Sequence, residues 1–358
     1  MAVLLAACVT AFLISFIISP VIIKYSLEKN LVDMPSRRKI HKKITPSMGG
    51  IAIFIGFTIA SSIWLDFHLW TSLRYLYASL LIVFLLGVRD DIVPLKVLHK
   101  LFGQVVAVVI LMGSSIQINS LHGFLGIHEL PIIANYAITT FSVIIIINSF
   151  NLIDGLDGLA GSIGLVALTA LGIWFYLADD FLFALLCFAM SGGVLAFLFF
   201  NWEPSQIFMG DTGAMVIGLL LAAFTIHFMN VNAALPIDHP AKFAATIAAA
   251  TCFIIIPLCD TLRIIILRLS KKQSPFTPDK SHIHHAIMRL GMTHSKTTII
   301  LASVHVFFIA VIILFRKVPE MYALPGVLFL ALIMTLILDQ LILKRLSTKN
   351  VVDDSEGG

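Results

Sequence analysis

The stretch Asn148-Ser-Phe-Asn-Leu-Ile-Asp-Gly-Leu-Asp-Gly-Leu-Ala-Gly161 lies between two apolar runs, one ending in Val143-Ile-Ile-Ile-Ile147 and one beginning at Leu159. It carries two carboxylates, two amides and three glycines. An ionisable residue at the edge of a membrane segment is costly to desolvate, and its default interpretation is a functional site. The stretch therefore predicts such a site if the two apolar runs cross a membrane.

The composition is that of a polytopic membrane protein. Of the 358 residues 59% are hydrophobic and 12% are charged, and the mean hydropathy is +1.00. Soluble domains carry about a quarter charged residues. The cysteines lie in apolar stretches without metal-ligand or disulfide spacing, so we interpret them as small packing residues: Cys8, Cys187, Cys252 and Cys259.

We expect an all-α fold with about eleven transmembrane helices, because runs of about 17–25 apolar residues are long enough to span a bilayer. The runs are 2–23, 48–65, 72–88, 101–118, 132–150, 158–178, 181–200, 213–231, 242–262, 297–315 and 322–343. No basic residue precedes the first run, which predicts a retained helix and not a cleaved signal. Residues 1–349 form one predicted catalytic domain, and the acidic tail 350–358 is predicted to be disordered.

The distribution of Lys and Arg predicts the orientation. Twenty of the 24 basic residues fall in segments on one side of the predicted topology. Basic residues gather on the cytoplasmic side of membrane proteins. This places the N-terminus outside, the C-terminus in the cytoplasm and the following loops on the cytoplasmic face: 24–47, 89–100, 151–157, 201–212 and 263–296.

Acidic residues gather on the same predicted face. Besides Asp154 and Asp157, the loops Arg89-Asp90-Asp91 and Met209-Gly-Asp211-Thr-Gly213 end apolar runs. The loops that carry Asp154 and Asp211 contain no Lys or Arg, so another cation is expected to neutralise them. A hard divalent ion with oxygen ligands is the natural candidate. We therefore predict that the three loops meet and hold a metal ion and a diphosphate.

Each motif also has a structural interpretation. Asp90 and Asp91 could form a solvated turn before Pro94, and Asp157 and Asp211 could cap the helices that follow them. The cluster His282-Ile-His284-His285 could be a plain surface feature. It lacks the further ligands of a structural zinc site, and contact with phosphate oxygens suits its setting better.

Several blocks carry a resemblance to a known family. They are Arg38-Lys-Ile-His41 with Pro46-Ser-Met-Gly-Gly50, Gly87-Val-Arg-Asp-Asp91, Lys100 with Gln104, Asn148–Gly158, Ile207-Phe-Met-Gly-Asp-Thr-Gly213, Pro257-Leu-Cys-Asp260 and Ser274-Pro-Phe-Thr-Pro-Asp-Lys-Ser-His-Ile-His-His285. In this order, the blocks resemble the polyprenyl-phosphate N-acetylhexosamine-1-phosphate transferase family. The last block is similar to the bacterial branch that starts O-antigen, enterobacterial common antigen or wall teichoic acid. The peptidoglycan branch has three consecutive histidines, whereas Ile283 interrupts the run here.

The resemblance implies transfer of N-acetylglucosamine-1-phosphate from UDP-N-acetylglucosamine to undecaprenyl phosphate in a bacterial plasma membrane, with release of UMP. It implies Mg²⁺, with Mn²⁺ as the alternative, held by Asn151 and Asp211. The implied catalytic residues are Asp90, Asp91, Lys100, Asp154 and Asp157. The implied substrate-binding residues are Asn148, Lys39, His41, Arg268, His282, His284 and His285. No nucleic-acid partner is expected, and a homodimer stays open beside a monomer.

Three alternatives compete with this interpretation. The same chemistry could use another UDP-N-acetylhexosamine, including that of the phospho-N-acetylmuramoyl-pentapeptide transferase branch. A transporter or flippase would place polar groups near the bilayer midplane, whereas the acids gather at one face here. A non-catalytic scaffold would not need three acidic, glycine-containing loops on one face. The sequence therefore favours an interfacial membrane enzyme.

Overall fold

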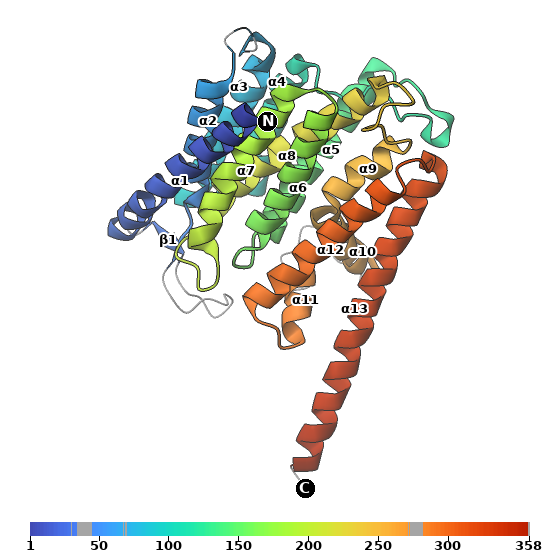
Figure 1. Ribbon diagram of the computed structural model, residues 1–358. Coiled ribbons are helices and arrows are strands. Elements are labelled where there is room, and N and C mark those ends of the chain that lie inside the picture. The colour runs from blue at the N-terminus through green and yellow to red at the C-terminus, as the bar shows by residue number, and fades with distance from the viewer. Residues whose placement is uncertain are drawn as a thin grey trace.

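The computed structural model describes residues 1–29, 31–33, 45–66, 68, 70–270, 272 and 282–356, and these are almost entirely helical (Figure 1). The elements are α1 Ala2–Glu28, β1 Val32–Asp33, β2 Thr45–Pro46, α2 Gly49–Trp64, α3 Trp70–Ile92, α4 Val97–Leu111, η2 Met112–Ser114, η3 Phe124–Gly126, α5 Ile132–Ile153, α6 Leu159–Leu177, α7 Phe181–Asn201, α8 Gly210–Ala234, α9 Thr246–Phe253, α10 Ile255–Ser270, α11 Ile283–Arg289, α12 His294–Leu314 and α13 Glu320–Glu356. The strands form a two-residue antiparallel ladder. The predicted all-α class is therefore confirmed.

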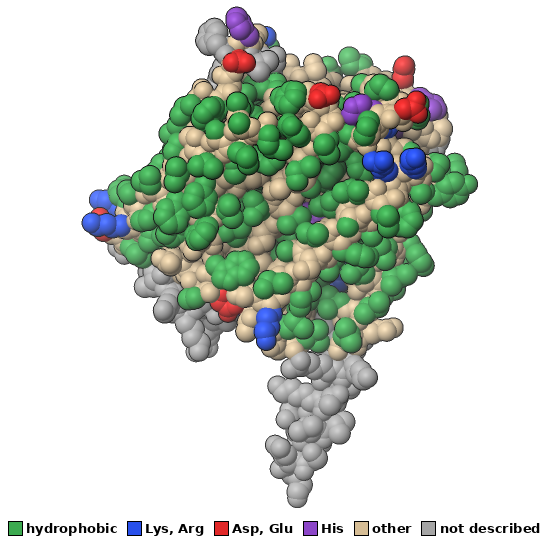
Figure 2. Space-filling model, viewed as in Figure 1, with side chains coloured by type: hydrophobic (Ala, Val, Ile, Leu, Met, Phe, Trp, Pro, Cys, Tyr) green, Lys and Arg blue, Asp and Glu red, His purple; other side chains and the backbone are tan. Residues whose placement is uncertain are grey.

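The helices have the length and composition of membrane spans. Within the described residues, eight helices are long and apolar enough to cross a bilayer, or nine if one bent pair counts as a span. The predicted runs 48–65 and 72–88 correspond to α2, which has 16 residues, and to α3. The surface in Figure 2 is dominated by hydrophobic side chains, with charged residues mainly near its margins. The chain is a multi-pass membrane protein, and the count of eleven stays a prediction.

The predicted run 242–262 is two helices and not one. α9 and α10 meet at an angle of 87° after Phe253. Pro257 lacks the backbone N–H that would bond the Phe253 carbonyl in a continuous helix. The buried ring of His305 on α12 contacts that carbonyl instead, with 3.0 Å between Nε2 and the oxygen. A side chain from another helix thus satisfies a backbone group that the break exposes.

α8 lies at the centre of the bundle (Figure 1). In an apolar stretch of 18 residues within α8, 83% of the residues are buried, compared with 28% in the corresponding stretch of α1 and 17% in that of α13. It packs against α2, α3, α5, α6 and α9. A helix that is apolar on every side is expected in such a position. The acidic loop before α8 is therefore anchored to the best-packed element of the fold.

Two glycines let neighbouring helices approach the start of α8. A Cβ atom added to Gly50 on α2 would lie 2.0 Å from the Gly213 nitrogen. One added to Gly87 on α3 would lie 2.4 Å from the Thr212 Cα atom. Neither contact leaves room for any side chain. The Gly49-Gly50 pair in the sequence thus marks a close helix contact.

α13 projects beyond the rest of the bundle at its C-terminal end (Figure 1). It continues to Glu356 and so passes through residues 350–356, for which the sequence predicts a disordered tail. No Pro or Gly occurs between Gly326 and Gly357, so nothing in the sequence interrupts the helix.

Candidate active site

The three acidic loops predicted to meet do meet at the first turn of α8. Asp91, at the end of α3, accepts hydrogen bonds from the backbone N–H groups of Asp211 and Thr212 at 2.7 and 3.0 Å. It also accepts from the Thr212 hydroxyl at 2.5 Å. These contacts satisfy orphan donors at a helix N-terminus, as a capping side chain does. Asp91 therefore caps α8 from a different helix.

Asp90 has a different environment from its neighbour. Its Oδ2 atom lies 3.0 Å from the Lys100 Nζ atom, and its Oδ1 atom accepts from the Leu95 backbone N–H at 2.5 Å. Lys100 also donates to Asp211 at 2.9 Å. The ammonium group thus bridges two carboxylates contributed by α3 and α8. The two adjacent aspartates therefore make different contacts in the structure.

Asn151 lies on the other side of Asp211. Its side-chain amide contacts the Asp211 Oδ1 atom directly. The two predicted metal ligands are therefore neighbours, with Lys100 next to them. The described residues contain no cluster of three or more His, Cys, Asp or Glu side chains arranged to hold a metal ion.

Asp154 follows the last residue of α5 and faces the same group of acids. Burial, followed by the nearby charges of Asp211 and Asp91, raises the pKa of its carboxyl group to about 8. The Gly210 backbone amide opposes this rise. The protein alone therefore disfavours the charged form of Asp154, and a nearby cation would favour it.

Asp157 is held by protein groups. Its carboxylate accepts from the Ser205 hydroxyl at 2.9 Å and lies 3.4 Å from the Nδ1 atom of His294. The Thr298 hydroxyl donates to the Asp157 backbone carbonyl at 2.9 Å. These contacts tie the loop 154–158 to the start of α12. His294, to which the sequence analysis assigned no role, thus belongs to the surroundings of the site.

The histidine cluster reaches this loop from α11. Asp260 on α10 accepts from the Ile283 backbone N–H at 2.7 Å and lies 2.8 Å from the His282 Nδ1 atom. A Cβ atom added to Gly155 would lie 3.0 Å from the Nε2 atom of His284. Burial, followed by the charge of His285, lowers the pKa of His284 to about 3, so its imidazole is neutral near pH 7.

Asp260 was missed as a site residue, although it is part of a block that carries the resemblance. Its partner His282 lies 22 residues further along the chain, so no local pattern links them. Buried acidic side chains are usually paired, and this rule was the available signal.

The other predicted substrate-binding residues are more scattered. Asn148 exchanges hydrogen bonds with Gln104 on α4, at 2.9 and 3.4 Å. Arg268 is buried on α10, eight residues after Asp260, which is about 12 Å along a helix axis. Lys39 and His41 lie outside the described residues.

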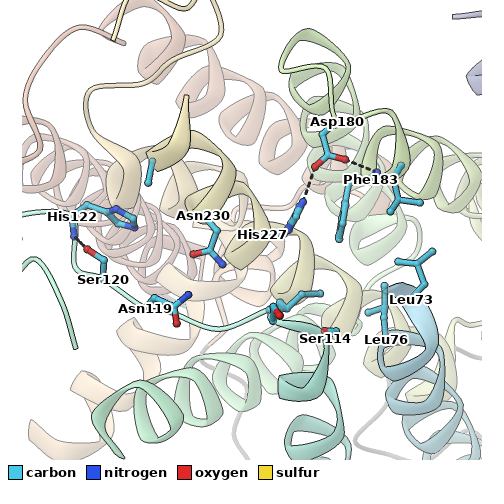
Figure 3. A pocket seen from close by; sticks show the side chains of 14 residues that line it. Leu73, Leu76, Ser114, Asn119, Ser120, His122, Asp180, Phe183, His227 and Asn230 are labelled. Atoms are coloured by element: carbon cyan, nitrogen blue, oxygen red, sulfur yellow. Dashed lines mark hydrogen bonds and ion pairs between the residues drawn. The ribbon is translucent and has the colours of Figure 1, made fainter. Parts of the chain in front are cut away.

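A cavity of about 650 Å³ lies at the opposite end of α8 (Figure 3). Its wall includes the ion pair between Asp180 and His227, whose Oδ2 and Nε2 atoms are 2.7 Å apart. His227 is 16 residues after Asp211, about 24 Å along the axis of α8. The cavity is therefore separate from the candidate active site.

Comparisons with known proteins identify the family and several relatives of this chain. The sequence profile of glycosyl transferase family 4 matches residues 73–229. A probable undecaprenyl-phosphate N-acetylglucosaminyl 1-phosphate transferase of Bacillus subtilis is 29% identical over 86% of this chain and 84% of its own length. An undecaprenyl-phosphate alpha-N-acetylglucosaminyl 1-phosphate transferase of Yersinia pestis is 32% identical over 78% of this chain and 75% of its own. One of Escherichia coli K12 is 30% identical over 78% and 74%.

The profile covers α3 to α8 and so includes Asp90, Lys100, Asn151 and Asp211. The relatives extend the similarity over most of the chain. This chain belongs to glycosyl transferase family 4.

Proposed function

We propose that this protein transfers N-acetylglucosamine-1-phosphate from UDP-N-acetylglucosamine to undecaprenyl phosphate, giving undecaprenyl-diphospho-N-acetylglucosamine and UMP. The observation that carries the proposal is the contact chain from Asp90 through Lys100 to Asp211 and Asn151. It occurs in a membrane protein whose relatives are named for this transfer. The names of the relatives support the donor and the acceptor, and the geometry supports phosphoryl transfer.

The residues around Asp211 suit Mg²⁺. Mg²⁺ is usually bound by one or two carboxylates together with substrate phosphates and water, so a complete protein cage is not required. Asp211 and Asn151 would hold the ion, and Asp154 is close enough for its charge to be felt at Asp211. Four acids gather near Asp211, counting Asp211 itself with Asp90, Asp91 and Asp154. Among the described residues, Lys100 is the one ammonium group that pairs with Asp90 and Asp211, so a further cation would be needed to keep all four ionised. A bound Mg²⁺ would neutralise negative charge on the diphosphate oxygens.

We expect Lys100 to bind the phosphate of the lipid acceptor. An oxygen of that phosphate attacks the phosphorus that bears the sugar. The bond from this phosphorus to the oxygen of the uridylyl phosphate breaks, and UMP leaves with the electron pair. A phosphate monoester has a second pKa of about 6, so the nucleophile is already largely dianionic near neutral pH. Asp90 therefore orients Lys100 and the acceptor and need not remove a proton.

The surroundings of the histidines support a contact with the donor. His282 is oriented by Asp260, and the neutral ring of His284 lies against Gly155 beside Asp154. A neutral imidazole donates one hydrogen bond and accepts another. We expect these rings to contact the diphosphate or the sugar while loop 154–158 forms the adjacent wall.

The site faces the cytoplasm of a bacterial cell, with the N-terminus outside. The excess of Lys and Arg on this side of the predicted topology supports that orientation. A cytoplasmic site would also meet a nucleotide sugar directly. The membrane would supply the polyprenyl acceptor from the side of the bundle.

A transfer assay tests the reaction and the metal site together. Purified protein in detergent receives undecaprenyl phosphate and radiolabelled UDP-N-acetylglucosamine, with Mg²⁺ or a chelator, and label is followed into lipid. Loss of metal coordination costs several kcal/mol of transition-state stabilisation, so Asp211→Asn is expected to lower transfer by about 100-fold or more. The exposed Asp238→Asn, a matched change far from the site, serves as the control.

The outcomes separate the parts of the proposal. Transfer that needs Mg²⁺ and collapses in Asp211→Asn, but not in Asp238→Asn, supports the reaction and the metal site. Transfer that ignores the chelator contradicts the metal site alone. Transfer only from a different UDP-N-acetylhexosamine would replace UDP-N-acetylglucosamine as the proposed donor. Failure with every nucleotide sugar would overturn the proposed reaction.

A further inference from the structure

The buried side chain of Asn201, at the end of α7, joins the two loops that carry Asp154 and Asp211. Its Oδ1 atom accepts from the Gly158 backbone N–H at 2.9 Å. Its Nδ2 atom donates to the Ile207 backbone carbonyl at 2.8 Å. One amide group thus connects the last residue of loop 154–158 to the first residue of segment 207–211, the loop that leads into the first turn of α8.

An amide is suited to this position. The bond to Gly158 requires an acceptor, and the bond to Ile207 requires a donor. Asn offers both on one short, planar group. The side chain is 3% exposed, so water cannot replace either bond. A carboxylate would satisfy Gly158 but would oppose the Ile207 carbonyl, and an apolar residue would leave both backbone groups unpaired.

The residues after Asn201 strengthen the connection to loop 154–158. Trp202 lies against Gly158, whose added Cβ would be 3.0 Å from the indole ring. Ser205 donates to Asp157 at 2.9 Å. Glu203 accepts from both the backbone and the hydroxyl of Ser295 at 2.8 Å. Segment 201–205 therefore contacts loop 154–158 and the start of α12.

We infer that Asn201 is a positioning residue that sets the relative position of these two loops for the reaction. The inference rests on the proposed function and extends it to a residue that touches no reacting group. Asp154 and Asp211 are close enough for their charges to interact. Phosphoryl transfer depends mainly on positioning and charge neutralisation, and a displacement of about 1 Å can cost about 100-fold in rate.

A matched variant is available at the other end of α8. Asn232 is also fully buried, accepts from the Phe243 backbone N–H at 2.9 Å and donates to the Phe243 carbonyl at 3.0 Å. It is 21 residues from Asp211, about 32 Å along the helix axis. Asn232→Leu therefore breaks comparable backbone bonds without touching the candidate site.

The experiment compares Asn201→Leu with Asn232→Leu in full-length protein in detergent. Amide hydrogen exchange is measured by mass spectrometry, and transfer rates are measured as kcat and KM per folded molecule. We expect faster exchange in segments 154–160 and 207–212 for Asn201→Leu only, with kcat lowered by about 100-fold. KM for the nucleotide sugar is expected to change by less than about threefold, because the substrate contacts themselves remain. Asn232→Leu should speed exchange near 241–248 and leave kcat within about threefold of wild type.

Three results overturn the inference. They are unchanged exchange in both segments of Asn201→Leu, faster exchange with an unchanged kcat, and equal losses of kcat in the two variants. Transfer by the wild type is scored separately. If the wild type transfers no sugar phosphate, the proposed function fails, while the exchange data still decide whether Asn201 joins the loops.

Discussion

Adjacent residues of the same type have different tasks in this site. Asp90 pairs with Lys100, whereas Asp91 caps α8 through the backbone of Asp211 and Thr212. Asp91 is therefore expected to act through the position of Asp211. Asp90 is expected to act through the charge and position of Lys100.

A double-mutant cycle separates these tasks. Thr212→Val removes one of the bonds to Asp91, and Asp91→Asn weakens the same cap. Their effects on kcat should be non-additive, with a coupling of about 0.5–3 kcal/mol. Each single variant should also lower the free energy of unfolding by about 0.5–2 kcal/mol, the usual cost of losing a cap.

The control for this cycle is Asp90→Asn combined with Thr212→Val. Asp90 contacts Lys100 and the Leu95 backbone, whereas the Thr212 hydroxyl donates to Asp91, so these two effects should add. Coupling of equal size in both cycles would contradict separate roles for the two aspartates.

The neutral ring of His284 predicts a loss of stability in acid. Its pKa is lowered to about 3 in the folded protein, from a usual value of 6.5. Above pH 6.5 both states hold a neutral ring. Below that pH the unfolded chain binds the proton first, so stability falls by up to about 1.4 kcal/mol per pH unit until the folded pKa is reached.

His284→Gln should therefore show a shallower loss of Tm between pH 6.5 and 4.5 than the wild type, measured in detergent. His99→Gln, a change at an exposed position, is the control and should follow the wild type. Parallel curves for wild type and His284→Gln would show that the buried ring is not a source of acid sensitivity.

At the scale of the element, the first turn of α8 depends on close contact with α2. A Cβ at Gly50 would lie 2.0 Å from the Gly213 nitrogen, and both positions belong to backbone packed against backbone. Gly50→Ala should therefore displace the start of α8, with a loss of about 1–3 kcal/mol in stability. It should also lower kcat, because Asp211 lies on the displaced turn.

Gly326→Ala is the control for this substitution. Gly326 lies within α13, and nothing lies within 4 Å of its added Cβ. Alanine in a helix interior is favoured over glycine by about 1 kcal/mol, so this variant should keep its Tm or raise it. If Gly50→Ala behaves like Gly326→Ala, the close contact with α8 is not needed for activity.

The whole molecule has a predicted orientation that labelling can test. Asp238→Cys and Lys96→Cys are introduced into a protein whose four native cysteines have been replaced. Both positions are exposed. Lys96 lies between α3 and α4, and Asp238 lies between α8 and α9, at the opposite end of the bundle. A membrane-impermeant maleimide added to intact cells should label Cys at 238 but reach position 96 only after permeabilisation. The reverse pattern would invert the topology and place the site outside.

Much of the architecture could be predicted because it depends on local composition. Each apolar run coincides with a helix or helix pair, since a run of apolar residues long enough to span a bilayer must bond its own backbone. The prediction that run 242–262 forms a single helix was wrong. Pro257 was a visible signal, but the donor that stabilises the break comes from His305, 52 residues from Phe253.

The sequence by itself determined the membrane class, the helical runs and the acidic loops where chemistry was expected. These depend on the kinds of residue within one segment. Only the tertiary structure decided that Asp91 caps α8, that Asp260 orients His282 and that Asn201 joins two loops. The Asp91 carboxylate and the Asp211 amide are 120 residues apart in the chain. Such pairs form because the packing of whole helices brings their ends together. A local sequence pattern covers only a few residues, so it cannot predict contacts between residues so far apart in the chain.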